Sequence, residues 1–121
     1  MAKIESHLDL IVWQKAMDLS VAVYRLTSRF PASENYPLTS QLTRAVVSVA
    51  ANIAEGHARS TAKDFANFLA IAPGSLAETQ TFILLAVRLG YVTQADVAVT
   101  LALPDEVGKM ISALRRRLAP R

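Results

Sequence analysis

Polar side chains form one line along an otherwise apolar segment, residues 41–59. Their spacings of 3 or 4 residues keep them on one side of a helix, which turns by about 100° per residue. The members of this polar line are Gln41, Arg44, Ser48, Asn52, Glu55 and Arg59. On one side of the line is a core stripe of Leu42, Val46, Val49 and Ile53. On the other side is a small-residue stripe of Val47, Ala51, Ala54 and Ala58. Because a helix that is apolar on two sides is normally packed on two sides, we expect it to lie between its own bundle and a partner.

A first helix is predicted over residues 10–29, where apolar positions recur at alternating spacings of 4 and 3 residues. This seam consists of Val12, Ala16, Leu19, Val23, Leu26 and Phe30. Trp13 and Tyr24 lie beside the seam. They either broaden the core face or reach a contact between subunits.

Two prolines, Pro31 and Pro37, separate this helix from the next, because the residue before a proline avoids the helical region. The second helix is predicted over residues 40–58, with Thr39 or Ser40 as its N-terminal cap.

Gly56 lies near the end of this second helix and is either its terminator or a point of close helix approach. We favour close approach, because several small residues lie nearby: Ala51, Ala54 and Ala58.

The third helix is predicted over residues 61–89, beginning at a capping pair of Thr61 and Asp64. Its apolar positions keep one phase throughout: Phe65, Leu69, Ala72, Leu76, Thr79, Ile83 and Ala86. Pro73 lies within the segment and removes one hydrogen-bond donor. Because the phase continues across Pro73, a single long helix bent at this residue is favoured over two helices joined by a turn.

The fourth helix is predicted from a capping pair of Thr93 and Asp96, with an interruption at Pro104. The part after Pro104 is the more clearly helical, with apolar positions at Val107, Ile111, Leu114 and Leu118. No strand is predicted. The expected fold is all-α, an antiparallel up-down-up-down four-helix bundle that forms a single domain over residues 1–121.

The composition indicates a protein that buries apolar surface in an oligomer or a membrane. Apolar residues make up 52% of the chain, which is high for a small domain whose surface should dominate. The best membrane candidate, residues 65–87, has periodic rather than continuous apolar positions, so we expect no membrane span and favour an oligomer. The first ten residues contain acids and a histidine where an export signal needs an apolar core. With no cysteine in the chain, we expect a cytoplasmic protein without disulfides.

Candidate catalytic and metal-binding groups are sparse. His7 and His57 are the two histidines, and neither has a metal-ligand spacing to a second ligand. The four glycines form no phosphate-binding loop, and neither Ser48 nor Ser75 has a histidine at helical spacing. We therefore expect no catalytic residue, no metal and no cofactor.

The polar line allows two interpretations. It is either a hydrogen-bonded network between helices or subunits, or the lining of a groove or central channel. The first is favoured because Glu55 balances one of the arginines, and Glu78 of the third helix is another possible partner for them.

A cluster of arginines near the end of the chain is the second candidate site. Arg115, Arg116 and Arg117 are consecutive and Arg121 follows. Repeated around an oligomer they would form a basic rim that binds nucleic acid; otherwise they are a solvated helix end. No aromatic residues are interleaved with them, so base-specific binding is not expected.

Several motifs resemble the four-helix bundle family first noted in intervening sequences of bacterial 23S rRNA genes. The densest is QLTRAVVSVAANIAEG at residues 41–56, which is similar to the family's QLRRAAVSIPSNIAEG pattern. The others are LIVWQKA at 10–16, LTSRFP at 26–31, ENYPL at 34–38, FLAIAPGSLAE at 68–78 and LGY at 89–91.

This resemblance implies a four-helix protomer that assembles into a ring-like homopentamer. It also implies kinship with the accessory proteins of diversity-generating retroelements, which bind nucleic acid and a reverse transcriptase. The recurring polar positions of the family fall on Arg44, Ser48, Asn52, Glu55, Gly56, Gly74, Ser75 and Glu78.

Together these features predict a non-enzymatic oligomer that binds RNA or DNA weakly through backbone charge. The residues expected to bind are Arg115, Arg116, Arg117 and Arg121, with Arg44 and Arg59. The alternative is an oligomeric scaffold that binds a protein partner such as a reverse transcriptase without touching nucleic acid.

Overall fold

The chain folds entirely into helices in the part that the structure describes. This structure is a computed structural model that describes residues 7, 10–35 and 37–120 of the 121. Its elements are α1 (Ile11–Thr27), the short 3-10 helix η2 (Ala32–Glu34), α2 (Leu38–His57), α3 (Ala62–Leu69), α4 (Ala72–Arg88) and α5 (Gln94–Leu118).

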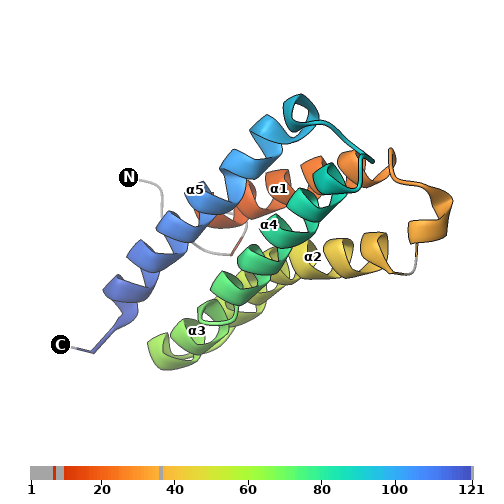
Figure 1. Cartoon of the computed structure of the whole chain (residues 1–121). Helices are drawn as coiled ribbons and strands as arrows, with labels where there is room; N and C mark the ends of the chain where they lie inside the picture. The colour runs from red at the N-terminus through yellow and green to blue at the C-terminus, as the bar shows by residue number, and fades with distance from the viewer. Residues whose placement is uncertain (1–6, 8–9, 36, 121) are drawn as a thin grey trace.

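The helices form a four-helix bundle in which α3 and α4 together make the third member. Along the chain, α1 packs on α2, α2 packs on both α3 and α4, α4 packs on α5, and α5 returns to α1. Successive members run in opposite directions (Figure 1). The predicted all-α bundle is therefore confirmed.

The predicted seams form the core. The five seam positions within α1, the sixth at Phe30 just after it, and all four core-stripe positions of α2 are buried. The largest fully buried side chains include Leu19, Leu42, Ile53, Leu69, Ile83 and Ile111. Each such side chain contributes about 1.5–3 kcal/mol when it leaves water, so these stripes dominate the stability of the bundle.

The third member comprises α3 and α4, which share one phase as the sequence predicts, with a break at Ala70 and Ile71 where a single bent helix was favoured. Between α3 and α4, Ala70 and Ile71 keep right-handed helical backbone angles. The ladder of hydrogen bonds to the carbonyl four residues back nevertheless breaks here. Pro73 has no amide proton to donate, and the Ile71 amide donates to the Phe68 carbonyl oxygen, three residues back, at 3.2 Å. Pro73 thus lies in the first turn of α4, where a missing donor costs little.

The prediction that Pro104 interrupts the last helix was wrong. Helix α5 runs without a break from Gln94 to Leu118, with Pro104 inside it and buried. A proline in a helix interior costs about 3 kcal/mol or more, through one lost hydrogen bond and crowding of the preceding turn. Burial of the Pro104 ring in the bundle offsets part of this cost, and only tertiary packing supplies that burial.

The predicted start of the second helix was also wrong. Helix α2 begins at Leu38, after Pro37, and no side chain of the described residues caps it. Thr39 Oγ1 is buried and has no hydrogen-bond partner in the described part of the chain. The main-chain carbonyl oxygen of Thr39, in contrast, accepts a hydrogen bond from Thr43 Oγ1 at 2.8 Å. The first helix, α1, is likewise shorter than predicted at both ends.

Both predicted capping pairs are confirmed. Thr61 Oγ1 accepts a hydrogen bond from the Asp64 amide at 3.1 Å. At the start of α5 the pair is reciprocal: the Asp96 amide donates to Thr93 Oγ1 at 3.1 Å, and the Thr93 amide donates to Asp96 Oδ2 at 2.8 Å. These contacts satisfy amides that the first turn of a helix leaves without partners.

Two polar contacts join the loops at one end of the bundle. Tyr91 Oη donates to Glu34 Oε2 at 2.6 Å, which raises the pKa of the Tyr91 phenol, and desolvation and the charge of Glu34 raise it further. Arg29 pairs with Asp96 at 2.7 Å. The Thr93 amide is the largest cause of the lowered pKa of Asp96, followed by Arg29.

Gly56 lies at a close approach between α2 and α3, as predicted. A Cβ atom at this position would lie 2.7 Å from Phe68 Cβ and 3.0 Å from Phe65 Cδ1. Real Cβ atoms essentially never come that close to another atom, so any larger residue forces the two helices apart.

We expect Gly56→Ala to destabilise the protein by about 1–3 kcal/mol, because the strain of overpacking exceeds the gain in helix propensity. Gly108→Ala is the matched control. Its Cβ would lie 3.7 Å from Leu76 Cδ1, an ordinary contact, so this variant should gain about 0.5–1 kcal/mol. Urea unfolding of both variants checks the pair, and equal effects would contradict the close approach.

Candidate nucleic-acid and assembly surfaces

The middle of the polar line is a hydrogen-bonded chain between α2 and α4. Asn52 Nδ2 donates to the Ser48 carbonyl oxygen at 2.8 Å and to Ser48 Oγ at 3.0 Å. Ser75 Oγ, on α4, donates to the same Ser48 oxygen at 3.1 Å. Ser48 and Asn52 are half-buried and Ser75 is buried. This arrangement fits the interpretation of a hydrogen-bonded network between helices. The partner that α4 contributes to this network is Ser75, whereas the sequence suggested Glu78.

The ends of the polar line are exposed. Gln41 and Arg44 face solvent at one end. At the other end, Arg59 Nη2 pairs with Glu55 Oε1 at 3.1 Å and the guanidinium lies 4.9 Å from the ring centre of Phe68. Because this pair is about half exposed, its ionic contribution to stability is about 0–1 kcal/mol.

An apolar patch lies beside the polar line, on the outer surface of α1 and α2. Val21, Tyr24 and Val47 line a shallow groove of about 680 Å³ between these helices. Tyr24 is 54% exposed. Trp13, by contrast, packs at the margin of the core with its ring edge-on to His7. The sequence left open whether Trp13 and Tyr24 broaden the core face or reach the surface. Trp13 broadens the core, and Tyr24 belongs to this exposed α1–α2 patch.

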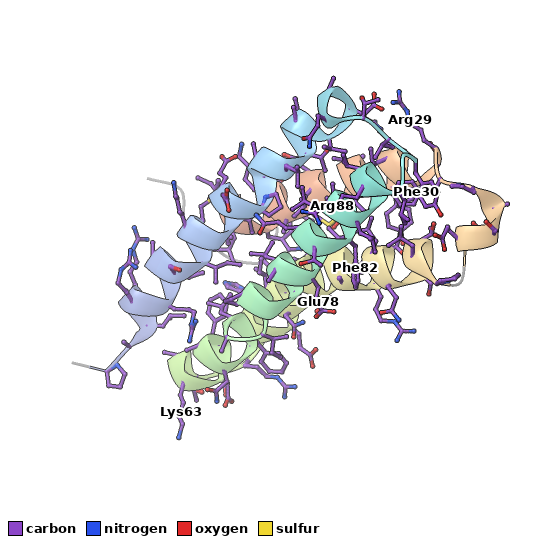
Figure 2. All side chains as sticks on the ribbon, in the orientation of Figure 1. Arg29, Phe30, Lys63, Glu78, Phe82 and Arg88 are labelled. Atoms are coloured by element: carbon purple, nitrogen blue, oxygen red, sulfur yellow. The ribbon has the colours of Figure 1, made fainter. Side chains whose placement is uncertain are left out.

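A second apolar surface follows α4. Ile71, Leu85 and Leu89 are exposed, and their spacing keeps them on one side of the helix. By the same spacing, Glu78 and Phe82, which are labelled in Figure 2, lie on that side as well. Glu78 is exposed and makes no ion pair within the described residues of one chain.

The terminal arginines divide between two sides of α5. Arg115 and Arg116 line a groove of about 950 Å³ between α3 and α5, together with Lys63. Arg117 lies beside α1, where it lines a smaller groove of about 330 Å³. Arg121 lies outside the described residues.

The four cations Lys63, Arg115, Arg116 and Arg117 form what we call the basic end of the bundle. Lys63 stands at the lower end of the molecule in Figure 2, the end at which α5 also terminates in Figure 1. Sequence reasoning missed Lys63 because 52 or more residues separate it from the arginines, and only the packing of α3 beside α5 brings them to one groove. Arg44 does not line this groove, and Arg59 is paired with Glu55.

Within the residues described, no group of three or more histidine, aspartate or glutamate side chains could hold a metal ion. The segment Ala62–Arg88 is long and apolar enough to cross a membrane by length and composition alone. Its core-facing side chains are buried inside the bundle, and one such segment is weak evidence for a membrane span.

Comparison with protein families matches residues 8–113 to the model of the 23S rRNA-intervening sequence protein family. The chain belongs to this family. The match covers α1 to α4 and most of α5 but ends before Arg115, so family membership gives no role to the arginines of the basic end.

A solved structure with the same fold is that of a protein of unknown function from the S23 ribosomal protein family, from Bacteroides thetaiotaomicron. The two chains share 24% sequence identity with a TM-score of 0.79, and the similarity covers 87% of this chain and 98% of the other. No curated protein matches the chain.

The contact between Ser48 and Ser75 should couple the stabilities of their variants. We expect Ser48→Ala and Ser75→Ala each to destabilise the protein, and their double variant to lose less than the sum by about 0.5–1.5 kcal/mol, because the shared hydrogen bond is lost only once. Urea unfolding measures this cycle. Ser28→Ala, which removes only an exposed local hydrogen bond, should combine additively with Ser75→Ala.

Proposed function

We propose that this protein is a non-enzymatic cytoplasmic homo-oligomer that binds RNA or DNA weakly, through the charge of the nucleic-acid backbone. The observation that supports binding is the basic end. Within the described chain, none of Lys63, Arg115, Arg116 and Arg117 makes an ion pair with a carboxylate.

The chemistry of these side chains suits phosphate more than bases. Phosphate contacts position a nucleic acid, whereas hydrogen bonds to base edges and stacking on aromatic rings read its sequence. Among the described residues, none of those that line the groove of Lys63, Arg115 and Arg116 is aromatic. The proposal is therefore sequence-independent binding, of micromolar or weaker strength.

The observation that supports assembly is the apolar surface that one protomer leaves exposed. The α1–α2 patch and the α4 surface include exposed apolar side chains such as Tyr24 and Leu85, which no described residue of the chain covers. A second copy of the chain is the proposed cover. Five copies would match the ring that the motif resemblance implies.

The alternative proposal is an oligomeric scaffold that binds a protein partner such as a reverse transcriptase and does not contact nucleic acid. The two proposals differ in one property. A scaffold should retain its protein partner after nuclease treatment, whereas a nucleic-acid binder should retain RNA or DNA at low salt.

Assembly predicts a solution mass of several protomers of 13.1 kDa each, and five in the pentameric form. Mass photometry or analytical ultracentrifugation at micromolar concentration measures it. A Val47→Glu variant should shift the population toward monomer, because it places a charge in the α1–α2 patch. Ala98→Glu, an exposed position on α5, is the control and should leave the mass unchanged. A monomeric wild-type protein would exclude assembly.

Nucleic-acid binding predicts a steep dependence on salt. Each phosphate contact lowers the logarithm of the binding constant by about 0.9 per logarithm of salt concentration for duplex DNA. Replacing Arg115, Arg116 and Arg117 by glutamate should reduce this slope and weaken binding at least about tenfold for duplex and single-stranded probes. Fluorescence anisotropy between 20 and 200 mM salt, roughly the range over which such binding collapses, provides the measurement.

Arg88→Glu serves as the control for this experiment. Arg88 is exposed in the last turn of α4, away from the basic end, and should leave the affinity nearly unchanged. Binding that does not respond to salt, or no binding at the lowest salt, would refute the nucleic-acid proposal.

A further inference from the structure

The groove between α3 and α5 is longer than a site for a small molecule. Its first part, of about 950 Å³, lies between α3 and the end of α5. A second part of about 510 Å³ continues between α4 and α5, and the two parts share Ser112 and Arg116. Together they follow α5 from Pro104 to its end at Leu118, which at about 1.5 Å per residue is roughly 21 Å, and the groove extends a little further to Pro120.

The first part of the groove is positively charged on both walls. Lys63 contributes from α3, and Arg115 and Arg116 contribute from α5. Among the described residues, none of those that line this part is acidic. Elsewhere in the described chain, Lys15, Arg29 and Arg59 each have a carboxylate within 4.0 Å, whereas Arg25, Arg44, Arg88 and Lys109 do not. The groove is therefore distinguished by the clustering of its cations, not by their lack of acidic partners.

The floor of the groove is apolar. Ala62 and Ala66, one turn apart on α3, face Leu118 across it. Small side chains let another segment approach the α3 backbone closely. Leu76 and Pro73 continue the apolar floor into the second part, whose walls add one acid and one base, Asp105 and Lys109. An occupant that fits must therefore bury apolar side chains along the floor and present negative charge to the walls of the first part.

This combination favours a protein segment over a nucleic acid. A phosphate backbone would use the cations but would leave Ala62, Ala66 and Leu118 against polar atoms, and bases would find no aromatic ring to stack on. An amphipathic helix meets both demands, because apolar residues at spacings of 3 and 4 lie on one face and acids can flank them. A helix of about 16 residues has the length of the groove.

We propose that the α3–α5 groove binds an acidic amphipathic helix of a protein partner, with apolar side chains against Ala62, Ala66 and Leu118 and carboxylates on Lys63, Arg115 and Arg116. This inference goes beyond nucleic-acid binding at the basic end but uses the same cations, Lys63, Arg115 and Arg116, so the peptide and a nucleic acid would compete for them. The proposed partner is a helix of about four turns, with one apolar face and acidic residues on either side of that face.

The experiment uses the full chain and a synthetic, fluorescein-labelled peptide of about 16 residues, with leucines at spacings of 3 and 4 and glutamates beside them. The control peptide has the same composition in scrambled order, which keeps the charge but removes the apolar face. Fluorescence anisotropy should show the amphipathic peptide binding at least about tenfold more tightly than the scrambled one. Equal affinities would overturn the proposal.

Two variants locate the peptide. Ser112→Trp fills the groove at the residue shared by its two parts, and Ser112 is exposed, so the fold should be retained. It should weaken peptide binding about tenfold. Ala102→Trp, at another exposed position of α5 outside the groove, should leave the affinity unchanged, and circular dichroism checks that both variants are folded. Unchanged peptide affinity in Ser112→Trp would overturn the proposal.

A single-stranded oligonucleotide measured on the same variants separates this inference from the proposed function. Backbone binding at the basic end should survive Ser112→Trp and weaken in Lys63→Glu. Peptide binding should weaken in both. If Ser112→Trp abolishes oligonucleotide binding and leaves no preference for the amphipathic peptide, the groove is a nucleic-acid site and the helix proposal fails.

Discussion

Helix α2 packs against three other helices, α1, α3 and α4, and the rest of the structure depends on this burial. Its core stripe is fully buried, which removes the largest apolar side chains of the segment from water. Contact with α3 is possible only because Gly56 has no side chain where Phe68 approaches. Contact with α4 includes the hydrogen bond from Ser75 to Ser48, a half-buried member of the polar line. On its remaining side α2 has exposed residues, among them Val47 and Ala51.

The surface of the protomer separates into regions of different chemistry. Apolar side chains gather on the outer sides of α1, α2 and α4, while cations without carboxylate partners gather at the end where α3 begins and α5 terminates. This separation is the basis of the proposed assembly, since association generally buries apolar area and leaves polar groups at the rim. The opposite end of the bundle is held by contacts within the chain, between Arg29 and Asp96 and between Tyr91 and Glu34.

Most of the bundle could be predicted because its signals are local and periodic. The seam of α1, the stripe of α2 and the phase shared by α3 and α4 each follow from one-dimensional spacing, and so do the caps at Thr61 and Thr93. Proline positions were harder to interpret. Pro73 and Pro104 carry the same local penalty, yet the ladder breaks at Pro73 and the helix continues through Pro104. The difference is tertiary, since the Pro104 ring is buried and Pro73 is exposed.

The sequence by itself determined the fold class, the core residues, the two capping pairs and the family, because each is encoded in spacing or in a contiguous motif. Only the tertiary structure decided which polar residues of different helices meet. It paired Ser48 with Ser75 across 27 positions and placed Lys63 in one groove with Arg115 and Arg116. Helical periodicity fixes which face of its own helix a residue occupies. It cannot fix which neighbour lies opposite, because that depends on where α3 and α5 pack closely and where they separate.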